Sequence, residues 1–112
     1  MTNGELLKKM SQDMNMRNFS HYTYDFYIRK TKEMIKYFNK PMEEVTIEEL
    51  RDYLYKHLLL ERKLSDKTVN HYNSVIRFIY EVTLDKLINK KQIPMRKLKK
   101  KVYKVLTKEE LS

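Results

Sequence analysis

The sequence predicts an all-α domain of four helices that ends near residue 84 and continues into a basic connector. The 112 residues include one glycine and two prolines, so few residues would interrupt a helix. Apolar residues recur at spacings of three and four, the period of a helix with one buried face. No segment alternates apolar and polar residues over the length of a strand. A chain of this size can bury a core, and it favours a single helical bundle.

Four helix starts are predicted from N-cap residues. A serine or threonine oxygen at this position can accept a hydrogen bond from a backbone N–H that the helix leaves unpaired. Each cap follows an apolar residue and precedes another at the fourth helical position, a pair known as a hydrophobic staple. The caps are Ser20, Thr46, Ser65 and Thr107, with the pairs Phe19–Tyr24, Val45–Leu50, Leu64–Val69 and Leu106–Leu111. Glu49 and Glu110 complete capping boxes with the two threonines.

Each predicted helix carries one apolar stripe. An opening helix is expected from about residue 5 to residue 15, and "NKP" at 39–41 should end the next one. The stripes are Leu6, Leu7, Met10 and Met14; then Tyr24, Tyr27, Ile28, Thr31, Ile35 and Phe38; then Ile47, Leu50, Leu54 and Leu58; and finally Val69, Tyr72, Ile76 and Ile79.

Two of the caps belong to a repeated pattern, apolar-Ser-x-x-Thr-x-x-x-Tyr, at residues 19–27 and 64–72. We interpret it as a firm helix start. The serine and the staple fix the first turn, and the tyrosine seven residues later reaches the core and sets the rotation of the helix.

Positive charge is concentrated late in the chain. Residues 1–84 carry 14 basic and 12 acidic side chains, whereas residues 85–104 carry 9 basic and 1 acidic. Such a run is either a solvated linker or a contact for a polyanion, usually nucleic acid.

The final cap indicates how the chain is organised. A helix that starts at Thr107 has only five residues before the sequence ends, too few to be stable alone. We therefore expect a helical domain at 1–84, an interdomain linker at 85–106 and the start of a second domain at 107–112.

Several kinds of chemistry have no support in the sequence. There is no cysteine, which excludes disulfides and thiolate zinc sites and indicates a reducing, cytoplasmic setting. The first residues lack the apolar core of a signal peptide, and the longest aliphatic run, residues 58–60, is far too short to span a membrane. The three histidines lack metal-ligand spacing, and one glycine cannot form a phosphate-cradling loop. No cofactor, metal, small-molecule substrate or catalytic residue is predicted.

One face of the fourth helix favours DNA. Lys67, Asn70, His71, Ser74 and Arg77 share this face because they are three or four residues apart. Their side chains can donate hydrogen bonds to phosphates and base edges, and a helix fits the major groove. The second helix gives a weaker signal, because Asp25 and Glu33 dilute its basic and polar face. That face carries His21, Thr23, Arg29, Lys30 and Lys32.

The order and spacing of four segments resemble the N-terminal core-binding domain of tyrosine recombinases, the phage integrase family. The segments are "SHYTYDFYIRKTKEMIKYF", "TIEELRDYLYKHL", "LSDKTVNHYNSVIRFIYE" and "IPMRKLKKKVYKVLTKEEL". The resemblance implies a SAM-like bundle of two crossed helical hairpins. It also implies that this domain clamps one face of duplex DNA at a recombination site, with its second and fourth helices against the major groove, while a C-terminal catalytic domain grips the other face.

The resemblance and the helix faces together give the expected DNA contacts. They are Thr23, Arg29, Lys30, Arg62, Lys67, Thr68, Asn70, His71, Ser74, Arg77, Lys99, Lys100 and Lys101. The expected partners are double-stranded DNA and other recombinase subunits assembled on it.

This chain is not itself expected to be an enzyme. The family's catalytic Arg, Lys, His-x-x-Arg and Tyr lie in the C-terminal domain, so Tyr103, in the linker, would not be the nucleophile. The alternative from the residues alone is a stand-alone helical protein-interaction module with a basic tail.

Overall fold

The computed structural model describes residues 2–86, 88 and 91–97. Within these residues the chain is helical throughout its regular structure and contains no strand. The elements are α1 (Asn3–Met16), α2 (His21–Phe38), the short 3₁₀ turn η1 (Met42–Glu44), α3 (Ile47–Asp52), η2 (Tyr53–Glu61), α4 (Asp66–Arg77) and η3 (Phe78–Thr83). Wider π-helical turns in η2 and η3 continue α3 and α4 without a break, so the four predicted helices are confirmed.

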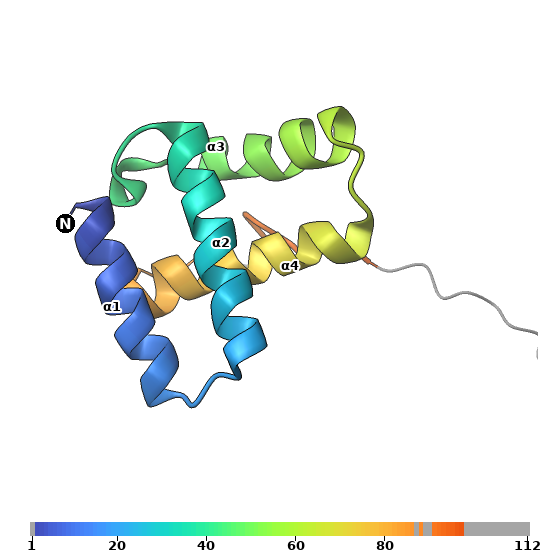
Figure 1. The fold of residues 1–112 in the computed structure, drawn as a ribbon. Coiled ribbons are helices and arrows are strands. Elements are labelled where there is room, and N and C mark those ends of the chain that lie inside the picture. The colour runs from blue at the N-terminus through green and yellow to red at the C-terminus, as the bar shows by residue number, and fades with distance from the viewer. Residues whose placement is uncertain (1, 87, 89–90, 98–112) are drawn as a thin grey trace, which may run out of the picture.

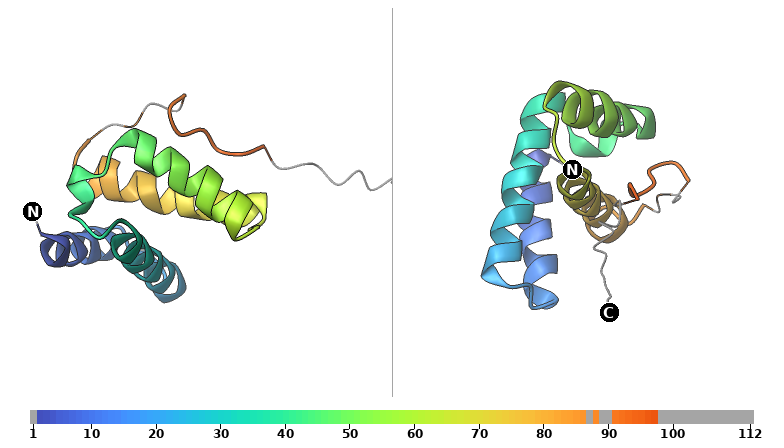
Figure 2. Two further views of the ribbon diagram at one scale, coloured as in Figure 1. Left: turned by 90° about the horizontal axis from the view of Figure 1, so that it is seen from above. Right: turned by 90° about the vertical axis from the view of Figure 1, so that its right-hand side faces the viewer.

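The helices form two antiparallel hairpins (Figure 1). One hairpin is α1 with α2, and the other is α3–η2 with α4–η3. Figure 1 and Figure 2 show that the second hairpin lies across the first, with α4 against α2 and η3 against α1. This arrangement confirms the predicted crossed-hairpin bundle, and it brings α2 and α4 into contact.

Three of the predicted caps are confirmed, and the two serine caps have the same geometry. The amide of Thr23 donates to Ser20 Oγ at 3.2 Å, and the amide of Thr68 donates to Ser65 Oγ at 3.2 Å. Thr46 and Glu49 form the predicted capping box. The predicted cap at Thr107 lies outside the described residues.

The first helix begins earlier than the predicted residue 5. Thr2 caps it by accepting the Glu5 amide at 3.1 Å, while the Glu5 carboxylate accepts the Thr2 amide at 2.8 Å. The sequence signal for this earlier start is the Thr-x-x-Glu pattern at residues 2–5, which is typical of a capping box.

The core lies where the two hairpins cross. The predicted stripes of the first, third and fourth helices supply its centre, whereas on α2 only Thr31 of the predicted stripe is buried and its other members are partly buried. Tyr72, the tyrosine of the second repeated pattern, is only 1% exposed. Tyr27, its counterpart on α2, is half-buried and packs edge-on against Phe19 and Phe78, each with ring centroids 5.6 Å away. The stripes did not include Met34, Met42 and Tyr53, which are also buried.

Residues assigned to the linker also reach the core. Ile88 and Ile93 are buried, although they follow the predicted domain end at residue 84. The boundaries at 84 and 106 stay predictions, but the folded body includes these two side chains.

We predict that the serine caps stabilise the first turns of α2 and α4. Ser20→Ala and Ser65→Ala should each lower the free energy of unfolding by about 1 kcal/mol, because a first-turn N–H loses its acceptor. Urea unfolding measures the change, with Lys32→Ala, an exposed mid-helix replacement on α2, as the control. Unfolding midpoints equal to the control in both serine variants would contradict the role of the caps.

Candidate nucleic-acid interface

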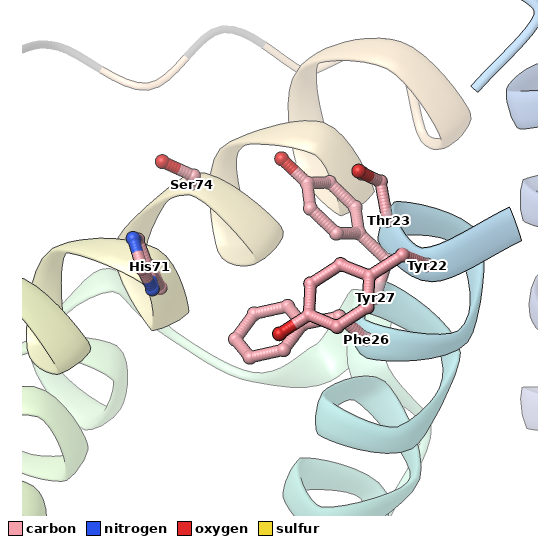
Figure 3. Close-up of a pocket in the computed structure, with 6 residues that line it drawn as sticks. All are labelled: Tyr22, Thr23, Phe26, Tyr27, His71 and Ser74. Carbon is pink, nitrogen blue, oxygen red and sulfur yellow. The ribbon is translucent and has the colours of Figure 1, made fainter. Parts of the chain in front are cut away.

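A groove of about 230 Å³ separates the first half of α2 from the middle of α4. Figure 3 shows Tyr22, Thr23, Phe26 and Tyr27 on α2 and His71 and Ser74 on α4, with the Ser74 hydroxyl directed away from α2. These six residues line the groove. Three of the predicted DNA contacts, Thr23, His71 and Ser74, therefore share one site.

The first turns of α2 and α4 present equivalent threonine hydroxyls. Ser20 Oγ donates to Thr23 Oγ1 at 3.0 Å, and Ser65 Oγ donates to Thr68 Oγ1 at 3.0 Å. A hydroxyl can donate one proton and accept two hydrogen bonds. Because each threonine oxygen accepts the serine proton, its own proton remains for an outside acceptor such as a phosphate.

Aromatic side chains make the floor and rim of the groove. His71 is exposed and packs edge-on against Phe26, with ring centroids 5.7 Å apart. Tyr22 is 79% exposed at the start of α2. Neither Tyr22 nor Phe26 was among the predicted contacts; the available signal was that both fall off the apolar stripe of α2.

Beside the groove, Glu33 on α2 joins three donors from three segments. Its carboxylate accepts hydrogen bonds from Lys30 Nζ at 3.0 Å and from the Tyr72 hydroxyl at 2.9 Å. Arg62, just after η2, donates to it at 3.3 Å and lies 3.4 Å from the Tyr72 hydroxyl. Partial burial acts to raise the pKa of Glu33, but the hydrogen bonds from Lys30, Tyr72 and Arg62 outweigh it and hold the pKa below its ordinary value.

This network uses two of the predicted DNA contacts internally. The Lys30 side chain is only 15% exposed, and its ammonium lies 5.0 Å from the centre of the Tyr72 ring. Lys30 is therefore placed to hold α2 against α4. Arg62 is more exposed, at the edge of the same network, and can still present part of its guanidinium outward.

Two further predicted contacts on α4 are occupied by residues 93–96. The Asn70 side chain pairs with the backbone of Arg96, donating to its carbonyl at 2.8 Å and accepting from its amide at 2.7 Å. Arg77 donates to Asn73 Oδ1 at 3.1 Å and to the carbonyl of Ile93. The structure thus divides the polar residues of α4 between two sides, one lining the groove and the other covered by the later chain.

Two predicted cations remain outward. Arg29 and Lys67 are exposed, and within the described part of the chain neither forms an ion pair. The predicted contacts Lys99, Lys100 and Lys101 lie outside the described residues.

Other kinds of site have no basis in the described residues. They contain no group of three or more His, Asp or Glu side chains that could hold a metal ion. None of their helices is long and apolar enough to cross a membrane.

Comparison with known families identifies the fold. Residues 6–90 match the family described as "Phage integrase, N-terminal SAM-like domain". The chain belongs to this family. The match spans all four helices of the domain, in agreement with the predicted resemblance.

A curated relative extends the similarity into the later residues. A protein of Sinorhizobium fredii, named as integrase/recombinase y4qK, is 29% identical over 107 residues, which is 95% of this chain. The aligned part is 34% of that protein, so the chain spans about a third of its length. No solved structure matches the chain significantly.

We predict that Glu33 contributes acid-sensitive stability. Glu33→Gln should lower the free energy of unfolding at pH 7 by on the order of 1 kcal/mol. Hydrogen bonds to a charged group contribute somewhat more than this when buried, but solvent weakens them here because Glu33 is partly exposed. Because the folded-state pKa is lowered, this contribution is complete above the ordinary glutamate pKa and is lost as pH falls through the folded-state value.

The stability difference between wild type and Glu33→Gln should therefore shrink between about pH 5 and pH 3. Urea unfolding at pH 7, 5, 4 and 3 measures this difference. A constant difference across that range would show that the ionised carboxylate does not stabilise the fold.

Proposed function

We propose that this domain binds duplex DNA at recombination sites and forms one half of a clamp in a tyrosine recombinase. The observation that carries the proposal is the convergence of α2 and α4 on one groove, which is lined by aromatic rings and by the polar side chains of Thr23, His71 and Ser74. A helix fits the major groove, so two helices at a shared groove can present their side chains to one stretch of duplex.

The electrostatics of the surface support a polyanion partner. Two of the acidic side chains on α2 and at the start of α4, Glu33 and Asp66, are paired with basic side chains of the domain. Glu33 accepts from three donors, and Asp66 is paired with Arg96, whereas Asp25 stays exposed 3.2 Å from His21. The outward cations, Arg29 and Lys67, are not opposed in this way, so the surface attracts phosphate.

The polar side chains of this surface suit two kinds of DNA contact, to phosphates and to base edges. Arg29, Lys67, Thr23 and Thr68 suit phosphate contacts, which hold the protein in register on the duplex. His71 lines the groove and suits contacts to base edges, where sequence is read. Ser74 Oγ donates to the Asn70 carbonyl at 3.2 Å, so toward a base edge its oxygen can act as an acceptor. Phe26 adds an apolar surface that suits a thymine methyl group.

Strand cleavage is assigned to a separate part of the parent protein. The family resemblance puts the catalytic Arg, Lys, His-x-x-Arg and Tyr in a C-terminal domain, and other recombinase subunits would join on the recombination site. The name of the Sinorhizobium fredii relative and the third of its length that aligns here support such an organisation. This domain would then bind DNA without cutting it.

We predict a salt-dependent affinity for duplex DNA that depends on the outward cations. Each lost phosphate contact should reduce the slope of log affinity against log salt by about 0.9, so Arg29→Ala with Lys67→Ala should reduce it by about 1.8. Fluorescence anisotropy with a labelled 20-base-pair duplex at several salt concentrations measures the slope. Lys56→Ala, on η2 and outside the groove, is the control with one lost charge.

The basic segment is tested in the same assay. Replacing Lys99, Lys100 and Lys101 by alanine should also flatten the slope, by up to about 2.7 if all three contact phosphates. A wild-type slope in both the double and the triple variant would contradict the proposed surface. Tight, salt-insensitive binding to a protein with no binding to duplex would instead favour the interaction module.

A further inference from the structure

Residues 91–97 return along α4 instead of leaving the domain at the end of η3. In Figure 1 and Figure 2 this segment runs beside α4 from its C-terminal end toward its N-terminal end. Ile93 is its buried anchor, with 1% exposure. The fully buried Asn73 of α4 donates to the carbonyls of Ile93 and Pro94 at 3.4 and 3.2 Å. We call residues 91–97 the strap.

The far end of the strap is held at the start of α4. Asn70 pairs with both backbone groups of Arg96, at 2.8 and 2.7 Å, and Asp66 on the first turn pairs with the Arg96 guanidinium. These contacts join residues 26 and 30 positions apart in sequence. The strap therefore has a fixed end point beside the first turn of α4.

This end point gathers positive charge at one corner of the domain. Lys63 lies in the turn before α4, Lys67 lies in its first turn, and the strap adds Arg96 and Lys97. All four are exposed. Asp66 offsets one of the four charges, so the corner keeps a clear positive excess.

We infer that the docked strap completes a phosphate-binding corner from Lys63, Lys67, Arg96 and Lys97, which grips the DNA backbone beside the α2–α4 groove. This inference rests on the proposed function and names a surface that the groove does not include. Asn70, Asn73 and Arg77 are then positioning residues for the strap. The family match ends at residue 90, so the strap lies beyond the region that defines the family.

Docking of the strap on α4 increases the contribution that Arg96 and Lys97 make to DNA binding. A charge on a free tail must be ordered when it binds, and that ordering opposes binding. The hydrogen bonds to Asn70 and Asn73 order the backbone of the strap during folding instead. Arg96 and Lys97 therefore approach DNA from a fixed position, and releasing the strap should weaken binding with every charge still present.

The first test examines the strap without DNA. The Arg96 amide donates to Asn70 Oδ1, so in the wild-type chain its hydrogen exchange should be at least ~10-fold slower than in an unstructured peptide. Ile93→Ala should return it to the unstructured rate, and Met95→Ala, an exposed strap position, should leave it slow. An unprotected Arg96 amide in the wild-type chain would overturn the strap.

The second test measures duplex binding by the same three proteins. Ile93→Ala keeps all charges, yet its salt slope should fall by about 0.9 to 1.8, equal to one or two phosphate contacts. Met95→Ala should keep the wild-type slope. Asn70→Ala, which releases only the far end of the strap, gives a second charge-neutral variant if Ile93→Ala does not fold.

The outcomes separate this inference from the proposed function. A wild-type slope in a variant whose Arg96 amide has become unprotected would overturn the corner and leave DNA binding by the groove intact. Absence of duplex binding by the wild-type chain at low salt would overturn both the corner and the proposed function.

Discussion

The crossing of α2 and α4 positions the groove, and Glu33 makes a polar contact between these two helices. Its carboxylate accepts from Lys30 on its own helix, from Tyr72 on α4 and from Arg62 at the end of η2. A partly buried carboxylate without hydrogen-bond donors would be unfavourable. The Glu33 carboxylate therefore favours the packing in which Lys30, Tyr72 and Arg62 all reach it. Lys30 and Arg62 are paired with Glu33, so these charges join the two hairpins. Arg29 and Lys67 remain outward and can contact a ligand.

The repeated pattern builds on that crossing. Ser20 and Ser65 start two helices with the same hydrogen bonds, and Tyr27 and Tyr72 then turn toward the core. Two helices that begin alike present corresponding first-turn threonines. The crossing of the hairpins places α2 beside α4, so the two helices that carry the repeated pattern share one groove. Thr23, His71 and Ser74 lie around this groove.

Sequence reasoning succeeded where the determining interactions are local. Helix starts at Ser20, Thr46 and Ser65 depend on atoms three residues away, and the apolar stripes depend on the helical period, so both could be read directly. It could not separate outward donors from internal ones. Lys30 meets an aromatic ring 42 residues further along the chain, and Asn70 meets a backbone 26 residues away, contacts that only the packed hairpins and the strap create.

NMR can show whether the α2–α4 groove and the neighbouring first turn of α4 face duplex DNA. A ¹⁵N-labelled chain is titrated with a 20-base-pair duplex at low salt, and the shifts of the backbone amides are mapped onto the fold. If the groove and the first turn of α4 bind the duplex, the largest shifts should fall at Thr23, Thr68, His71 and Ser74, with little change on α1 at Lys8 and Lys9. Shifts concentrated on α1, with the groove unaffected, would contradict binding by the groove.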